Sequence, residues 1–249
     1  MTDHSQRDDR TPDPMRSPVR PTPPQPSSGT SQTPRPAPTV PNAASSGESV
    51  SHDPAAALNA IRSKMELVSD EFAQGKINSV QFHVMYRRYS EQRTIIEKLI
   101  ERDPEGDAWQ RVMSVKGQTG FLRSQYEAQA LCYAIFRAGS AKPILTGGKA
   151  PADEPMLAAM AAKLWQLPKR PNPGLARKAL PTSHWIIVAT GDHAATFAVF
   201  SIEPSNAQAR LVRDLHADFE RANAAAFARD QIVPERMVFP QRALGQGTL

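Results

Sequence analysis

Proline is unevenly distributed along this chain, and its distribution limits which residues can build a folded core. Of the 23 prolines in the 249 residues, twelve lie within residues 1–54. The same stretch has no Phe, Trp or Tyr, and the first aromatic residue is Phe72. Such a segment cannot bury enough apolar surface to offset the entropy lost on ordering. We therefore expect residues 1–53 to form a disordered tail, and the fold to come from the residues that follow.

Composition also indicates in which cellular compartment the protein is expected. Cys132 is the only cysteine, so no intramolecular disulfide can form, which is typical of a reducing compartment. No run approaches eighteen consecutive apolar residues, so no membrane span is predicted. Residues 1–10 are polar and include three aspartates, unlike a secretory signal. These features favour a cytoplasmic protein.

The part after the tail begins with two segments that have the apolar spacing of amphipathic helices. Asp53 and the proline after it are typical of a helix start. Apolar residues then recur at intervals of three and four, and Gly75 ends the pattern; this stripe is Leu58, Ile61, Met65, Val68 and Phe72. Asn78, with Gln81 three residues later, resembles a capping box that opens a second helix, whose apolar stripe is Phe82, Met85, Tyr89, Ile96 and Leu99. We therefore predict a helical hairpin over residues 54–116.

The clearest strand signal comes from residues 185–189 and 196–200, two runs rich in β-branched and aromatic residues. Gly191 and Asp192 lie between them and have the chemistry of a tight turn, so a β-hairpin is predicted.

An earlier pair of strands is also predicted. Gly117 and Gly120 break the helical pattern, and residues 125–137 are then apolar on both alternating faces, as in a strand covered on two sides. A buried helix would show the same pattern, because periodicity alone does not separate the two. Residues 143–146 are the expected partner strand.

Two further helices accompany these strands. Residues 156–167 have helical spacing and end at Pro168, and a long helix opens at Ser205. The apolar stripe of this last helix consists of Val212, Leu215, Phe219, Ala222 and Ala226. The order strand, strand, helix, strand, strand, helix predicts an α+β domain over residues 117–231, an antiparallel sheet flanked by helices. Residues 232–249 are expected to form an irregular arm.

The formal net charge is +5, and its clearest concentration is a proline-rich segment, residues 168–182, that has no acidic residue. Its basic residues are Lys169, Arg170, Arg177 and Lys178. The simpler interpretation is a solvated basic loop without a binding role, and the alternative is a surface that binds nucleic acid or another anionic partner. The segment has no aromatic side chain, so stacking on nucleic-acid bases is not supported.

No motif in the sequence reaches the specificity of a catalytic or cofactor site, so no cofactor or metal is predicted. The six histidines are at positions 4, 52, 83, 184, 193 and 216. Asp214, His216 and Asp218 are two residues apart, which does not place them on one helix face for a metal. Cys132 lies among apolar residues and is expected to be buried and inert. An enzyme would require Cys132 to meet His184, His193 or Asp192 in one pocket.

The segment from Met156 to Ala226 resembles the roadblock/dynein-light-chain and longin type of profilin-like domain. The likeness rests on the helix at 156–167, on the strand pair at 185–202, and on the phrase Phe200-Ser201-Ile202-Glu203-Pro204-Ser205 before the final helix. Separately, Phe72-Ala73-Gln74-Gly75-Lys76-Ile77 with Phe82 resembles the short helical-hairpin oligomerisation modules appended to many bacterial proteins.

The roadblock resemblance implies a non-catalytic platform that forms a homodimer and binds a protein partner, in bacteria often a Ras-like small GTPase. We therefore expect a protein-protein interaction or signalling scaffold rather than an enzyme. The expected partner-binding residues are the basic cluster and three residues of the last helix: Lys169, Arg170, Arg177, Lys178, Val212, Leu215 and Phe219. Nucleic-acid or anionic-surface binding is the first alternative, and an unrecognised enzyme is the second.

Overall fold

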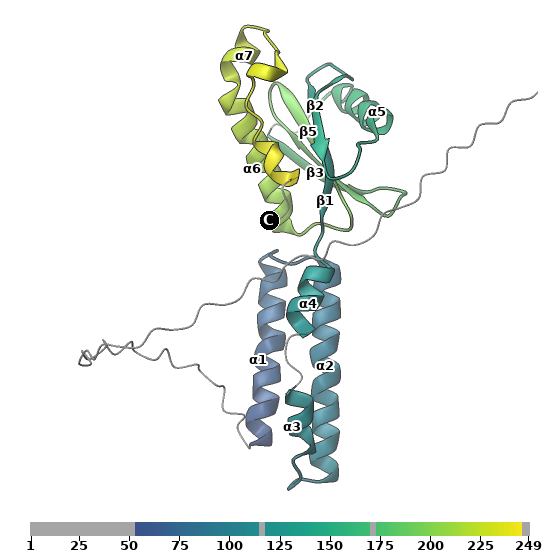
Figure 1. The fold of residues 1–249 in the computed structure, drawn as a ribbon, viewed down its shortest axis with the longest axis vertical. Helices are drawn as coiled ribbons and strands as arrows, with labels where there is room; N and C mark the ends of the chain where they lie inside the picture. Colours follow the sequence, from purple (N-terminus) through teal and green to yellow (C-terminus); the bar gives the residue numbers. More distant parts are fainter. Residues whose placement is uncertain (1–52, 115–117, 170–172, 246–249) are drawn as a thin grey trace, which may run out of the picture. The chain divides into compact units, whose positions relative to one another are not determined.

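The computed structural model describes residues 53–114, 118–169 and 173–245, and Figure 1 shows the arrangement of their helices and strands. The predicted tail, residues 1–53, lies outside the described residues except for Asp53. The described chain is α+β with an antiparallel sheet, as the sequence predicts, and the sheet has five strands, one more than expected. None of the described helices combines the length and the apolar character that a membrane crossing requires.

Helices α1 (Pro54–Ala73) and α2 (Ser79–Arg102) begin at the two predicted caps. The Asp53 side chain accepts a hydrogen bond of 2.9 Å from the backbone N–H two residues later. Asn78 Oδ1 accepts from the N–H of Gln81 at 2.8 Å, and Gln81 Oε1 accepts from the N–H of Asn78 at 2.9 Å. Both predicted caps are confirmed, and they satisfy N–H groups that the first turn of a helix leaves without a partner.

The two helices pack against each other through one apolar cluster. The short helix α3 (Ala108–Met113) completes this cluster with Trp109, which is 3% exposed. The buried members of the cluster are Ala57, Ile61, Val68, Ile77, Met85, Tyr89, Ile96 and Trp109. Most of these residues belong to the stripes predicted from spacing, because a spacing of three and four places side chains on one helix face.

The segment before the sheet differs from the prediction. Helix α4 (Gln118–Gln125) runs through Gly120, and strand β1 (Ala130–Arg137) starts five residues after the expected position 125. A glycine inside a helix costs only about 1 kcal/mol relative to alanine. A contact from α2 holds the end of α4, since Gln81 Nε2 donates to the carbonyl oxygen of Arg123 at 2.7 Å. This contact joins residues 42 positions apart, so the local pattern does not contain it.

The sheet has the strand order β2-β1-β5-β4-β3, and all neighbouring strands are antiparallel. The strands are β1, β2 (Pro143–Gly148), β3 (Gly174–Ala179), β4 (Trp185–Thr190) and β5 (Ala194–Phe200). β4 and β5 form the predicted β-hairpin, with Ile187 opposite Ala198. β5 lies at the centre of the sheet and is buried along its whole length, which explains its apolar sequence.

Strand β3 corrects the prediction of a basic loop over residues 168–182. Six of those residues pair with β4, and Arg177 lies opposite Ile187. β3 is an edge strand, and all but its first residue are exposed. Edge strands tolerate charged side chains because only one of their sides is paired, and a composition of Arg, Lys and Ala does not predict a strand.

Two apolar layers cover the sheet, and Figure 1 shows α5 and α6 on opposite faces of it. Helix α5 (Glu154–Trp165) packs on the face that contains Cys132 and Phe197. Helix α6 (Asn206–Ala222) packs on the other face, where Ile135 and Ile187 are fully buried. The short helix α7 (Ala224–Ala228) follows α6.

The described part of the arm, residues 232–245, is not irregular, which corrects another prediction. It contains two 3-10 turns, η1 (Pro234–Arg236) and η2 (Pro240–Gly245), and packs on the α6 side of the sheet. Phe239 is 6% exposed and stacks on Phe219 at 5.5 Å between ring centroids. Asn223 holds the arm, because its side chain accepts from the N–H of Val238 at 2.9 Å and donates to the carbonyl oxygen of Val238 at 2.7 Å.

Candidate functional site

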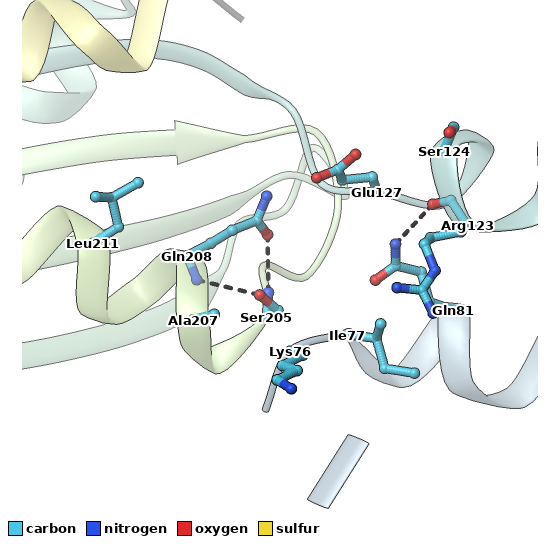
Figure 2. A pocket seen from close by; sticks show the side chains of 10 residues that line it. All are labelled: Lys76, Ile77, Gln81, Arg123, Ser124, Glu127, Ser205, Ala207, Gln208 and Leu211. Carbon is cyan, nitrogen blue, oxygen red and sulfur yellow. Dashed lines mark hydrogen bonds between the residues drawn. The ribbon is translucent and has the colours of Figure 1, made fainter. Parts of the chain in front are cut away.

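A cavity of about 280 Å³ lies where the turn between α1 and α2, the end of α4 and the start of α6 meet. Figure 2 shows the ten side chains that line it. They are Lys76, Ile77, Gln81, Arg123, Ser124, Glu127, Ser205, Ala207, Gln208 and Leu211. The walls of this cavity come from segments about 130 residues apart in the chain, so no local sequence pattern indicates it.

The polar side chains around this cavity connect the helices to the sheet. A second capping box opens α6, where Ser205 Oγ accepts from the N–H of Gln208 at 3.2 Å and Gln208 Oε1 accepts from the N–H of Ser205 at 3.0 Å. The other end of that amide, Gln208 Nε2, donates to the carbonyl oxygen of Ala128 at 2.8 Å. In the same way, Asn78 Nδ2 donates to the carbonyl oxygen of Tyr126 at 2.9 Å. Both capping boxes therefore also fix the chain that leads into β1.

Further contacts join the turn between α1 and α2 to the start of α6, and we call this region the junction. The N–H of Ala207 donates to the carbonyl oxygen of Gly75 at 2.9 Å, and Ser79 Oγ donates to Glu203 Oε2 at 2.6 Å. Gly75 has a φ of +71°, and a Cβ there would lie 2.5 Å from the Cβ of Asn206. Glycine is therefore required at this turn both by the backbone conformation and by the close approach of α6.

The cavity is lined by charged, amide and hydroxyl groups. Its ionisable side chains are Lys76, Arg123 and Glu127, and Arg123 also forms an ion pair with Glu71 of α1. Of its two serines, Ser205 uses its hydroxyl oxygen in the cap of α6. Across the residues that the structure describes, no three His, Cys, Asp or Glu side chains gather as metal ligands would.

An aromatic surface lies beside this junction, on the turn end of α1 and α2. The ring of Phe82 stacks on Phe72 at 4.6 Å between centroids and lies 5.3 Å from the rings of both Tyr86 and His83. Phe72 is 40% exposed and Tyr86 is 38% exposed, and His83 is also exposed. The sequence placed Phe72 on the apolar stripe of its helix, but the ring contacts α2 at the edge of the cluster instead of entering it. We call Phe72, Phe82, His83 and Tyr86 the aromatic surface.

The four basic residues predicted to bind a partner do not share one loop. Lys169 is exposed after the end of α5, and Arg170 lies outside the described residues. Arg177 and Lys178 are exposed neighbours on β3. Successive side chains of a strand point to opposite faces, and Arg177 Nη1 donates to Asn206 Oδ1 of α6 at 3.0 Å. Arg177 is therefore on the α6 side of the sheet, and Lys178 is directed to the opposite side.

The three predicted partner-binding residues of the last helix are mostly core residues, which corrects their assignment. Val212 and Phe219 are 0% exposed and pack on the sheet, and Leu215 is half-buried against the same cluster. Phe219 contacts the rings of Phe227 and Phe239. Side chains enclosed by their own chain cannot contact a partner unless the domain opens.

Cys132 and the histidines named with it as possible enzyme residues lie in different parts of the sheet domain. Cys132 is 6% exposed on the α5 face, and burial raises the pKa of its thiol, with a smaller contribution from the Asp153 carboxylate. His193 lies in the turn between β4 and β5, as predicted, and its ring stacks on Phe227 at 5.1 Å. His184 interacts with the hydroxyl of Thr182. Cys132 pairs with Val199 and Gly148 in the sheet, whereas His184 precedes β4 and His193 lies between β4 and β5.

A buried polar group around His216 was not found by sequence reasoning. His216 is 3% exposed, and its Nδ1 lies 2.9 Å from Thr196 Oγ1, which also accepts from Gln241 Nε2 at 3.2 Å. The hydrogen bond between Nδ1 and Oγ1 can run in either direction, because a hydroxyl has one donor and two acceptor lone pairs. Nε2 lies 3.8 Å from Glu220 Oε1. His216 is four residues after Val212 and three before Phe219, and this spacing is the signal that could have placed it on the core stripe.

Glu220 holds the turn between β4 and β5. Its carboxylate accepts from the backbone N–H groups of Asp192 at 3.0 Å, His193 at 2.8 Å and Ala194 at 2.8 Å. A Cβ at Gly191 would lie 2.1 Å from the same carboxylate. The turn chemistry predicted from Gly191 and Asp192 is thus confirmed, and the structure adds the acceptor from α6.

Acid is expected to destabilise the protein through His216. Burial lowers the pKa of this imidazole, and the Glu220 carboxylate opposes that effect in part. In the unfolded chain the histidine takes up a proton below about pH 6.5, whereas the folded protein resists it, so stability is lost as the pH falls below that value. The loss is at most about 1.4 kcal/mol per pH unit. Urea denaturation at pH 7.5 and pH 5.5 should show a smaller loss for His216→Gln than for the unsubstituted protein, and an equal loss would contradict this role.

Comparison with known protein families, curated proteins and solved structures found no match.

Proposed function

We propose that this chain is a non-catalytic protein-protein interaction module of the roadblock-like, profilin-like type, with a helical hairpin at its N-terminal side. The observation that carries the proposal is the aromatic surface, where four rings gather near the turn end of α1 and α2 and three of the four side chains are exposed. Aromatic side chains dominate the binding energy of protein interfaces because each buries a large area at low cost in conformational entropy.

The order of elements supports the roadblock-like part of this proposal. The sequence resemblance rests on a helix, a strand pair and the phrase that leads into the last helix, and the sheet domain has α5, β4, β5 and α6 in that order, with β3 added before the β4–β5 pair. The second resemblance supports the aromatic surface, because the phrase that resembles helical-hairpin oligomerisation modules contains Phe72 and is completed by Phe82. In this proposal the chain forms a homodimer, acts in the cytoplasm and binds a protein partner, for which a Ras-like small GTPase is the class that the resemblance implies.

The proposal predicts that the aromatic surface is required for association. In the double variant Phe72→Ser with Tyr86→Ser, we expect self-association or partner capture to weaken by about thirtyfold or more, because an interface hot spot contributes about 2 kcal/mol. Light scattering during gel filtration measures the dimer, and titration against a purified GTPase measures the partner. Ile95→Ser is the matched control, since Ile95 is 48% exposed on α2 outside the aromatic surface.

The double variant and its control should differ in association but not in folding. The control should keep the association of the unsubstituted protein, and circular dichroism should show that all variants are folded. Full association of the double variant would overturn the aromatic surface as the contact. A strict monomer that binds no protein would overturn the function itself.

A further inference from the structure

A groove lies between the edge strand β3 and helix α6. It shares no lining residue with the cavity beside Lys76 and Gln208, which we call the junction cavity. The volume of the groove is about 300 Å³. Its lining residues are Leu175, Arg177, Asn206, Ala209, Arg210 and Arg213. Three of these six side chains are arginines, and none of the six is acidic. Only Arg177 belongs to the basic cluster recognised in the sequence, so this grouping exists only in the folded protein.

The fold explains why these residues converge. Leu175 and Arg177 are two residues apart on β3, so they share one face of the sheet. On α6, residues 206, 209, 210 and 213 stand at positions i, i+3, i+4 and i+7, so they share one side of the helix. The hydrogen bond from Arg177 to Asn206 joins the two elements at 3.0 Å. The groove therefore has a strand wall and a helix wall.

The positive charge of the groove is only partly neutralised. Arg213 forms an ion pair with the neighbouring Asp214, and its Nε and Nη2 donate to the Asp214 carboxylate at 3.0 and 2.9 Å. The partner of Arg177 is a neutral amide. No carboxylate among the described residues forms an ion pair with Arg177 or with the exposed Arg210. Two unpaired guanidinium groups beside a third produce a local positive potential that attracts an anion.

The side chains that line the groove restrict the class of ligand that can bind in it. A guanidinium group presents planar, paired N–H donors whose spacing fits the oxygens of a phosphate group. The remaining wall is short and apolar, since Ala209 is 4% exposed and Leu175 is 40% exposed. The groove has no aromatic side chain on which a base could stack, which disfavours single-stranded nucleic acid. Its volume is at the lower limit for sites of small organic ligands.

We propose that the β3–α6 groove binds the phosphate group of a small phosphorylated compound or of a lipid headgroup, with Arg177 and Arg210 as the main donors and Arg213 as an auxiliary donor. This inference is independent of the aromatic surface and of the partner proposed above. It also differs from a basic loop that binds nucleic acid, because its donors come from a strand and a helix.

The test uses the full chain and inorganic pyrophosphate as the probe, in isothermal titration calorimetry at low salt. Arg210→Gln should weaken pyrophosphate binding by about tenfold or more, since it removes the donor of a charge-assisted hydrogen bond. Arg177→Gln should have a similar effect. Arg221→Gln is the matched control, because it removes the same charge from the same helix at a side chain that is 76% exposed and pairs with Asp218. The control should bind as tightly as the unsubstituted protein.

A second arm separates the two sources of the phosphate group. Sedimentation with vesicles that contain phosphatidic acid in phosphatidylcholine, compared with vesicles of phosphatidylcholine alone, tests the lipid headgroup. Binding that depends on Arg210 in either arm supports the proposal and identifies the source. The proposal is overturned if neither probe binds, if Arg221→Gln weakens binding as much as Arg210→Gln does, or if only a single-stranded oligonucleotide binds through Arg210.

Discussion

Replacing Phe219 with alanine is expected to lower the free energy of unfolding by about 3–5 kcal/mol, the usual cost of removing a buried aromatic side chain. The Phe219 side chain is 0% exposed and lies between the sheet, α7 and the C-terminal arm. Its ring stacks on Phe239 and meets Phe227 edge-on at 5.8 Å. The substitution leaves a cavity that these neighbours can fill only in part. Urea denaturation followed by circular dichroism measures the change.

The matched control for this variant is Phe121→Ala, because the two substitutions remove the same ring from different environments. Phe121 is 66% exposed on α4, so its loss is expected to change stability by less than about 0.5 kcal/mol. The comparison also tests the corrected role of Phe219. A stable Phe219→Ala protein that had lost only self-association would return Phe219 to the partner surface predicted from the sequence.

Replacing Glu220 with alanine is the second large effect, and we expect it to cost about 2–3 kcal/mol of unfolding free energy. The carboxylate accepts three backbone N–H groups of the β4–β5 turn and has a side chain that is only 16% exposed. Hydrogen bonds to a charged acceptor are stronger than neutral ones, and the freed N–H groups must find water at a partly covered turn. Glu220→Gln, which keeps one acceptor oxygen, should lose less.

The control for Glu220 is Asp218→Ala on the same helix. The side chain of Asp218 is 51% exposed and pairs with Arg221, an exposed pair of the kind that contributes at most about 1 kcal/mol. Amide hydrogen exchange gives a second measurement, since the N–H groups of His193 and Ala194 should lose protection in Glu220→Ala. A variant as stable as Asp218→Ala with unchanged exchange would exclude Glu220 as the anchor of the turn.

Features whose cause lies within a few residues of chain could be predicted. The caps at Asp53 and at Asn78 with Gln81 are examples, because a capping side chain bonds to an N–H two or three positions away. The β4–β5 hairpin is another, since its turn residues and its apolar strands are contiguous. The antiparallel α+β class follows from the order of such segments.

Features that depend on contacts between distant segments could not be predicted in this way. The strand β3 is held by pairing to β4, although its own residues favour a solvated loop. The arm that carries Phe239 acquires structure only because the sheet gives it an apolar surface to cover. The junction cavity and the arginine groove likewise consist of side chains from separate segments.

The amino-acid sequence by itself determined the caps, the apolar stripes and the central hairpin, because local periodicity and turn chemistry act over short distances. Only the tertiary structure decided which stripe residues are enclosed, that His216 and Glu220 meet the β4–β5 hairpin, and that Arg177 faces Arg210 across a groove. The physical reason is that burial and charge depend on what the rest of the chain places beside a residue, and a linear pattern does not contain that information.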